Sequence, residues 1–145
     1  MRVVITRVLS ASVTVDGEVI GELQKPGLLV LAGVGRDDTV EDAEALARKI
    51  WGLRILDGEA SASDVDAPIL VVSQFTLFAA TRKGRRPSWS RAAPGSLSEP
   101  LVERLCGAFE ELGATVERGR FGADMKVASV NDGPITIVID TQDWE

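Results

Sequence analysis

The alternation of apolar and polar residues predicts β-strands in the first quarter of the chain. Residues 2–15 alternate irregularly, as expected of a long strand with one buried face. Asp16-Gly17 comes next, and this pair readily supplies the positive φ angles of a tight turn, so we expect a hairpin that returns through Ile20. Residues 27–34 are apolar on both faces, which indicates a central strand covered on each side.

Two later segments follow the period of a helix. In the first, either Asp38 or Thr39 can cap the amino terminus. Its apolar positions have the i, i+3, i+4, i+7 spacing of a buried helix face, and they are Ala43, Leu46, Ala47 and Ile50. The second helix is predicted over residues 99–112, with Pro100 in its first turn and Gly113 as its C-cap. Its expected buried stripe is Leu101, Leu105, Ala108, Phe109 and Leu112.

The rest of the chain is predicted as short strands and loops. We expect strands at 53–56, 69–78, 114–117, 125–130 and 135–140, and loops at 57–67 and 79–96. Without an internal repeat, residues 1–145 are interpreted as a single α+β domain. The expected architecture is a curved, mainly antiparallel, barrel-like sheet with two helices packed on it.

Composition indicates the cellular compartment of such a protein. Hydrophobic residues make up 45% and charged residues 26%, and no apolar run is long enough to cross a bilayer, so we expect no membrane association. The amino terminus lacks the features of a secretory signal, and Cys106 is the only cysteine, so no internal disulfide can form. We therefore expect a cytoplasmic protein in which Cys106 is a packed, inert thiol.

The absence of histidine limits the possible chemistry. It excludes a Ser-His-Asp triad, a Cys-His dyad and every histidine-based zinc site. Catalysis must then rely on hydroxyls, carboxylates, backbone amides, lysine or groups of the substrate itself. We expect no cofactor and no metal, since Asp64 and Asp66 merely alternate along a loop and are interpreted as solvated.

Two segments are candidates for binding. Ser73-Gln74 interrupts an apolar strand, and a buried polar group without a partner costs about 1–3 kcal/mol, so the pair is either satisfied locally or lies at a site open to ligand. The loop after it concentrates Arg82, Lys83, Arg85 and Arg86 beside Trp89 in a chain of net charge −6. Such a loop suits a phosphate backbone, or else forms ion pairs with the protein's own acids.

A third candidate is Gly133-Pro134, which follows a polar turn at Asn131-Asp132 and precedes an apolar run. Proline has no N–H for a sheet ladder and glycine has no side chain, so the pair suits either a plain turn into an edge strand or a place where backbone carbonyls face a ligand. The residues alone leave both alternatives open.

Four motifs together make the chain resemble the D-aminoacyl-tRNA deacylases: SQFTL at 73–77, TRKGRRPSW at 81–89, GRFGADM at 119–125 and NDGPITIVID at 131–140. The resemblance implies a homodimer of β-rich subunits that hydrolyses the ester between a D-amino acid, or glycine, and the 3′-terminal adenosine of tRNA. It assigns Ser73, Gln74, Phe75 and Thr76 to the catalytic motif.

The same resemblance implies that Gly133 and Pro134, joined by a cis peptide, enter the active site of the partner subunit and exclude L-amino acids. Arg7 would hold that motif in place, and Met125 would contribute to substrate binding. The expected reaction is attack by water, with the Phe75 N–H stabilising the oxyanion and the ribose 2′-OH assisting. Two departures from the family pattern are the short 57–67 segment and Ala80, where relatives often carry aspartate.

Two rival interpretations remain. The first is a non-catalytic RNA-binding module that uses the basic loop with Phe75 and Trp89 as stacking surfaces. The second is an esterase acting on a small acyl substrate, which has little use for a basic loop. Release of D- and L-tyrosine from matched charged tRNAs separates these alternatives.

Overall fold

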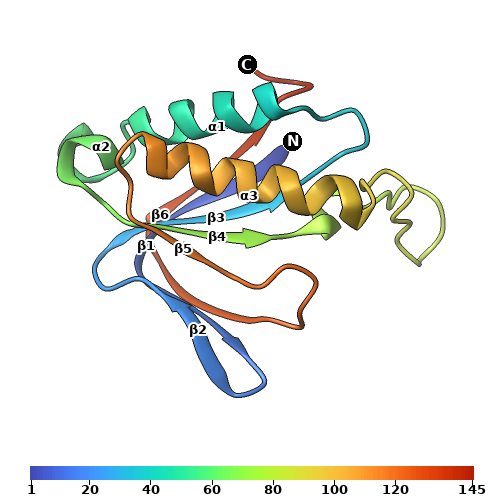
Figure 1. The fold of residues 1–145 in the computed structure, drawn as a ribbon, viewed down its shortest axis with the longest axis horizontal. Coiled ribbons are helices and arrows are strands. Elements are labelled where there is room, and N and C mark those ends of the chain that lie inside the picture. Colours follow the sequence, from blue (N-terminus) through green and yellow to red (C-terminus); the bar gives the residue numbers. More distant parts are fainter.

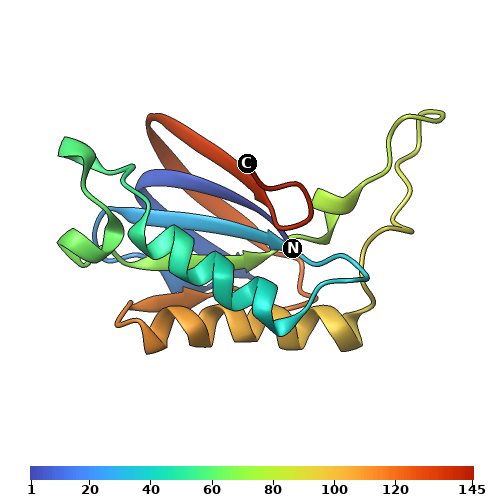
Figure 2. The same cartoon turned by 90° about the horizontal axis from the view of Figure 1, so that it is seen from above.

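A six-stranded mixed sheet forms the centre of the molecule in the computed structural model, which describes residues 1–145, and two long helices lie on one of its faces (Figures 1 and 2). The strands are β1 (Arg2–Val15), β2 (Glu18–Glu22), β3 (Gly27–Gly33), β4 (Ile69–Ser73), β5 (Val116–Arg118) and β6 (Lys126–Asp140). Their order is β2-β1-β3-β4-β5, and β6 pairs with the other side of β1. The long β1 therefore pairs with three other strands and is the central strand of the sheet.

The pairing directions give the sheet its mixed character. β1 is antiparallel to β2, β3 and β6, whereas β4 is parallel to β3 and β5 is parallel to β4. The sheet curls until β2 approaches β5, so that a Cβ on Gly21 would lie only 2.6 Å from the carbonyl oxygen of Arg118. This nearly closed barrel confirms the predicted fold class.

Helix α1 (Val40–Gly52) forms as the sequence predicts. Thr39 is the N-cap, and it exchanges hydrogen bonds with Asp42 in a capping box that satisfies two backbone N–H groups of the first turn. All four residues expected on its inner face are fully buried against the sheet. Burying each leucine or isoleucine side chain contributes about 1.5–3 kcal/mol, so this face docks the helix firmly.

Helix α3 (Gly95–Glu111) begins four residues before the predicted start, with Pro94 as its N-cap. Pro100 therefore lies beyond the first turn. Gly113 follows the helix with a φ of +102°, as the predicted C-cap requires. The expected buried stripe is confirmed except for Leu112, which follows the end of the helix and is exposed. Cys106, which was not expected in the stripe, is also buried.

The predicted middle segments are partly wrong. Residues 53–56 form no strand beyond a single bridge between Leu56 and Ala60. The 57–67 segment is ordered: it contains a 3₁₀ turn, η1 (Asp57–Glu59), and a third helix, α2 (Ala62–Val65). Ser61 and Asp64 form a capping box at α2, in which Asp64 is exposed, as predicted, and hydrogen bonds from the backbone and side chain of Ser61 lower its pKa.

The core has two parts, one on each side of the sheet. The larger lies between the sheet and the two long helices and includes Ile5, Val30, Leu46 and Phe109. The smaller lies inside the curl of the sheet, around Val13 and the other residues Val8, Ala11, Val15, Leu23, Leu29, Leu70 and Val72. β3 and β4 therefore have apolar residues on both faces, which confirms the prediction made for β3. No helix is both long and apolar enough to cross a membrane.

Candidate active site

The Ser73–Thr76 motif lies where β4 stops. The predicted strand over 69–78 ends at Ser73, and the chain turns into a 3₁₀ helix, η2 (Phe75–Phe78). The Gln74 N–H still donates to the Ala32 carbonyl at 2.8 Å, which anchors the start of the turn to β3. Phe78 is buried by this change of direction, whereas Phe75 is turned outward.

The turn presents two backbone donors. The first hydrogen bonds within it run from Leu77 N–H to the Gln74 carbonyl and from Ala79 N–H to the Thr76 carbonyl. The N–H groups of Phe75 and Thr76 precede these bonds, so the turn itself contains no acceptor for them. Unpaired N–H groups at the first residues of a helical turn are available to an anion or an oxyanion.

The side chains of the motif are only partly satisfied within the chain. Gln74 Nε2 donates to Thr76 Oγ1, which restrains both side chains, whereas the Ser73 hydroxyl has no hydrogen-bond partner in the protein. No acidic or basic side chain forms a hydrogen bond with Thr76 Oγ1, so nothing in the chain activates it as a nucleophile. Within the pair, Gln74 is thus satisfied by a neighbouring side chain, whereas the Ser73 hydroxyl remains available to a ligand or to water.

A cleft of about 240 Å³ lies against this motif. Its walls come from β3, the start of α3 and the 119–125 motif, and its residues are Ala32, Val34, Ser73, Gln74, Phe75, Ala93, Gly95, Ser98, Val102, Phe121 and Gly122. Among these, Gly95, Ser98, Phe121 and Gly122 line the candidate site without having been predicted to do so individually. Phe121 and Gly122 belong to the GRFGADM motif, which was the signal available for them.

The cleft adjoins a larger groove of about 490 Å³, and Ser73 and Phe121 line both. The groove carries Arg118, which is paired with Glu103 and Glu110, and Arg120, which forms no ion pair in the chain. Cys106 lines its floor with 1% of its surface exposed, and burial raises the pKa of this thiol to about 12. The burial confirms the predicted packed thiol, and the raised pKa favours its protonated form, which is the less reactive one.

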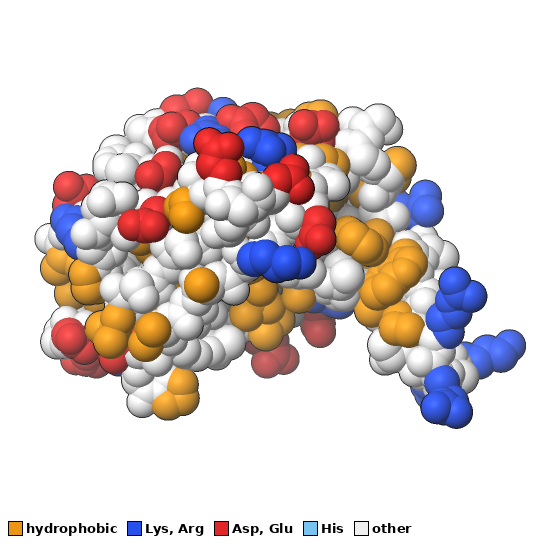
Figure 3. All heavy atoms as spheres, turned by 90° about the horizontal axis from the view of Figure 1, so that it is seen from below, with side chains coloured by type: hydrophobic (Ala, Val, Ile, Leu, Met, Phe, Trp, Pro, Cys, Tyr) orange, Lys and Arg blue, Asp and Glu red, His pale blue; other side chains and the backbone are white.

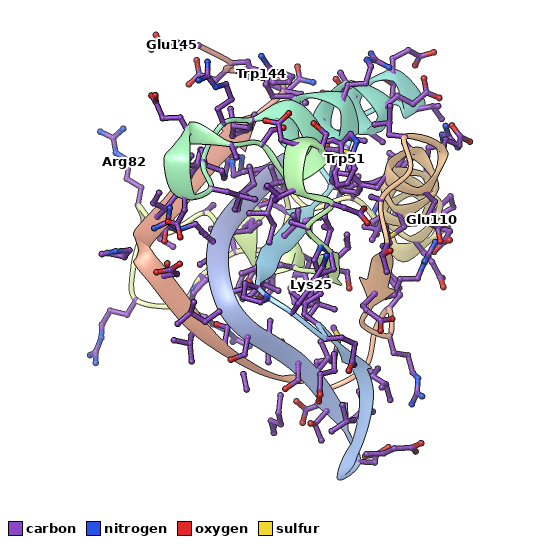
Figure 4. The ribbon with its side chains drawn as sticks, turned by 90° about the vertical axis from the view of Figure 1, so that its left-hand side faces the viewer. Lys25, Trp51, Arg82, Glu110, Trp144 and Glu145 are labelled. Atoms are coloured by element: carbon purple, nitrogen blue, oxygen red, sulfur yellow. The ribbon has the colours of Figure 1, made fainter.

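The basic loop projects from the body as an arm formed by residues 79–94 (Figures 1 and 2). Ala80 and Ser88 exchange backbone hydrogen bonds at its base. The basic residues at its tip, Arg82, Lys83, Arg85 and Arg86, are exposed and none forms an ion pair, so the alternative of internal ion pairs is wrong. Figure 3 shows basic side chains gathered at the tip, and Figure 4 shows Arg82 pointing away from the body.

Gly133 and Pro134 lie in an outward excursion of β6. Asn131 is opposite Val8 and Thr136 is opposite Thr6, so four residues of β6 face Arg7 alone. Asn131 closes the excursion: its side chain accepts from the Ile135 N–H at 3.2 Å and donates to Thr136 Oγ1 at 2.8 Å. The two strands predicted at 125–130 and 135–140 are therefore one strand, interrupted where the polar turn was expected.

The peptide bond between Gly133 and Pro134 is cis, which confirms the prediction of its geometry. Arg7 lies against the excursion, since its Nε donates to the Asp132 carbonyl at 3.1 Å and its Nη1 donates to the Ile55 carbonyl at 3.1 Å. Gly133 has a φ of +123°, and a Cβ there would lie 2.9 Å from Arg7 Nη2. Both the backbone angle and the close arginine therefore require glycine.

The structure does not bring the two motifs together within one chain. Arg7, beside Gly133, is opposite Leu28, whereas Ser73 is opposite Ala32 of the same strand. A four-residue offset and three strand spacings separate them by on the order of 15–20 Å. A groove of about 210 Å³ beside Gly133 is lined instead by Arg7, Asp57, Asp132 and neighbouring residues, among them Lys25, labelled in Figure 4.

Met125 is packed away from the cleft. Its Sδ accepts the Arg120 N–H at 3.4 Å, and its side chain packs with the smaller core cluster. A Cβ on Gly119 would lie 2.7 Å from this sulfur, so the two residues interlock beneath the 119–125 segment. A direct role for Met125 in substrate binding stays a prediction.

Comparison with known proteins assigns the family. The family model described as D-Tyr-tRNA(Tyr) deacylase matches residues 4–140. The chain belongs to this deacylase family. It is 65% identical over 144 residues to the D-aminoacyl-tRNA deacylase of Cutibacterium acnes, with 99% of each chain covered. It is 61% identical over 142 residues to that of Mycolicibacterium smegmatis, with 97% of this chain and 99% of the relative covered.

Two solved structures show the same fold. The c-Myc DNA unwinding element binding protein superposes with a TM-score of 0.90 at 36% identity, covering 97% of this chain and 99% of its own. A probable eukaryotic D-amino acid tRNA deacylase superposes with a TM-score of 0.82 at 16% identity, covering 95% and 97%. The second likeness, at this low identity, concerns the fold alone. The deacylase family thus has the curled mixed sheet described above.

Proposed function

We propose that this deacylase-family chain hydrolyses the ester of D-aminoacyl-tRNA and releases the free D-amino acid and tRNA. The observation that carries the proposal is the start of the η2 turn beside the Ser73–Phe121 cleft, where the N–H groups of Phe75 and Thr76 have no acceptor within the turn. Hydrolysis of an ester passes through a tetrahedral oxyanion, and preorganised backbone donors stabilise that charge without having to reorganise.

Water is the proposed nucleophile. The chain has no histidine, and Thr76 Oγ1 is bound to Gln74 rather than to a base, so covalent catalysis by Thr76 lacks an activating group. The ribose 2′-OH next to the ester is a hydroxyl that the substrate itself brings to the site. We assign it the role of assisting the attacking water, while Ser73 and Gln74 position the ester.

Discrimination against L-amino acids is assigned to Gly133 and Pro134 of a partner subunit. Both residues are exposed in the isolated chain and lie far from Ser73, so they can complete the site only in a second copy. β6 supports such a dimer, because one of its edges is unpaired and Val127, Val130 and Val138 are exposed on it. Rigid main-chain atoms at the α-carbon would exclude an L side chain sterically while admitting glycine.

The arm is assigned to the acceptor end of tRNA. Four unpaired cations at one tip form a local positive field on a protein of net charge −6, which suits a phosphate backbone better than a small uncharged ester. This argument disfavours the small-ester alternative. A substrate on tRNA also agrees with the expected cytoplasmic location.

The deciding experiment measures release of D-tyrosine and L-tyrosine from matched charged tRNAs. We expect rapid release of D-tyrosine, slow release of L-tyrosine, and release of glycine from glycyl-tRNA(Ala). tRNA binding without release of either enantiomer contradicts the proposal and supports an RNA-binding module. A substrate ending in 2′-deoxyadenosine tests the 2′-OH: undiminished cleavage would show that the ribose hydroxyl does not assist.

A further inference from the structure

Phe75 and Trp89 form an aromatic pair that the fold leaves exposed. Their ring centroids are 5.2 Å apart with an interplanar angle of 77°, an edge-to-face arrangement. Phe75 is 56% exposed and Trp89 is 43% exposed, although both belong to the largest apolar side-chain types. An edge-to-face pair leaves ring faces open to the solvent, and an open aromatic face is a surface on which a planar base can stack.

The pair lies between the cleft and the cations of the arm. Phe75 lines the cleft and begins the η2 turn, while Trp89 follows the cationic tip of the arm by three residues. The order along the surface is therefore cleft, aromatic pair, then cations. Figure 3 shows apolar and basic side chains side by side on this projecting part of the molecule. A continuous strand of nucleotides meets these groups in turn.

Trp89 is held by backbone contacts on both sides. Ser88 bonds with Ala80, the Trp89 carbonyl accepts the Ala92 N–H at 3.0 Å, and Arg36 Nε donates to the Ser90 carbonyl at 2.7 Å. The tryptophan is thus anchored to the loop after β3 and to the base of the arm. A ring held in place loses little conformational freedom when a ligand binds, which favours a stacking role.

We propose that Phe75 and Trp89 form a stacking platform for the single-stranded nucleotides that precede the terminal adenosine of the substrate. The inference rests on the proposed function, since the cleft is taken to hold that adenosine. Stacking accepts any base, because every base has a π-face, so the platform provides affinity for single-stranded RNA without sequence choice. It also fixes the direction in which the strand enters the cleft.

Quenching of Trp89 fluorescence tests the platform directly. The double variant Trp51→Phe/Trp144→Phe leaves Trp89 as the only tryptophan. Titration with the trinucleotide CpCpA should quench its emission, whereas an abasic trimer of equal charge should not. Equal quenching by both probes, or none by CpCpA at millimolar concentration, overturns the proposal.

Kinetics provide a second measurement that does not depend on that variant. Trp89→Ala should lower kcat/KM for D-tyrosyl-tRNA about tenfold more than it lowers kcat/KM for D-tyrosine esterified to adenosine alone, because only the longer substrate reaches the platform. Trp89→Phe should restore most of the difference. Equal losses on both substrates would mean that Trp89 only supports the Phe75 turn. If the wild type releases no D-tyrosine, the proposed function fails, while the quenching experiment still decides on stacking.

Discussion

Replacement of Arg2 by methionine should weaken both the fold and the active turn. The Arg2 guanidinium is bound by two polar groups: its Nε and Nη2 contact Asp140 Oδ2 at 2.9 and 2.8 Å, and its Nη1 donates to the Leu77 carbonyl at 2.7 Å. It also lies over the Phe78 ring, 4.7 Å from the centroid. Arg2 therefore ties the end of β6 to the turn that carries the Phe75 and Thr76 N–H groups.

The size of the effect follows from burial. The Arg2 and Asp140 side chains are 25% and 15% exposed, so their pairing is less screened than that of a surface ion pair. Removing the guanidinium leaves a half-buried carboxylate and a carbonyl without their donor, which costs about 1–3 kcal/mol. Methionine keeps a side chain of similar length against Phe78. We expect a loss of about 2 kcal/mol, or a fall in Tm of about 4–8 °C for a chain of this size.

The loss should depend on pH with a defined sign. Burial works to raise the pKa of Asp140, but hydrogen bonds from the Gln142 N–H and from Arg2 outweigh it, and the pKa is lowered. A lowered folded-state pKa stabilises the fold above the unfolded value of about 3.9, and this stabilisation is lost as the pH falls through the folded value. The difference between wild type and Arg2→Met should therefore be largest at neutral pH and narrow below about pH 4.

Urea unfolding at fixed protein concentration, repeated from pH 7 to pH 3, measures this difference. Arg48→Met is the matched control, because Arg48 is exposed and forms no ion pair, and it should change stability by less than about 0.5 kcal/mol. On D-tyrosyl-tRNA, Arg2→Met should lower kcat more than it raises KM, since the turn presents donors to the transition state. Superimposable unfolding curves for Arg2→Met and wild type at pH 7 would show that the Arg2 contacts with Asp140 and Leu77 do not stabilise the fold.

Three further predictions concern other parts of the molecule. Asp38→Asn should cost about 3–5 kcal/mol in urea unfolding, because the buried Asp38 carboxylate lies 2.5 Å from the Met1 amino group, and a cost below 1 kcal/mol would contradict a buried ion pair. Gly133→Ala should strongly reduce release of D-tyrosine, because a Cβ at a φ of +123° meets Arg7; normal activity would exclude this segment from the site. Replacing Arg82, Lys83, Arg85 and Arg86 together with glutamine should reduce the slope of log kcat/KM against log salt by up to about 3, whereas an unchanged slope would mean that these residues do not contact phosphates.

Local patterns predicted the elements whose residues interact mainly with their neighbours in sequence. Thr39 and Asp42 cap α1 within one turn, and the apolar spacing of α1 matches the face that the sheet buries. The 57–67 segment was misjudged because its composition is small and polar. Its order comes from a capping box at Ser61 and from packing of Ala62 into the larger core, and only the second of these depends on tertiary structure.

The end of β4 shows why the local structure of the site could not be predicted from the residue pattern. Residues 69–78 have uniform strand character, but the strand stops at Ser73 because its hydrogen bonds to β3 run out one residue later, at Ala32. The turn that follows depends on contacts that are distant in sequence: Arg2 on the Leu77 carbonyl and Gly33, where a Cβ would lie 2.8 Å from the Gln74 carbonyl oxygen. No pattern within 69–78 contains that information.

The excursion at Gly133 also depends on contacts that are distant in sequence, although here the sequence pattern did predict a break. The structure contains this break at residues 132–135. β6 nevertheless continues before and after it, because β1 is long enough to pair with both parts of the strand. Arg7 contacts the segment from that strand. The placement of Gly133 and of Ser73 therefore both depend on β1, which carries Arg7 against one motif and Arg2 against the other. A shift of β1 by one residue would displace both arginines at once, so the register of this single strand couples the two halves of the proposed site.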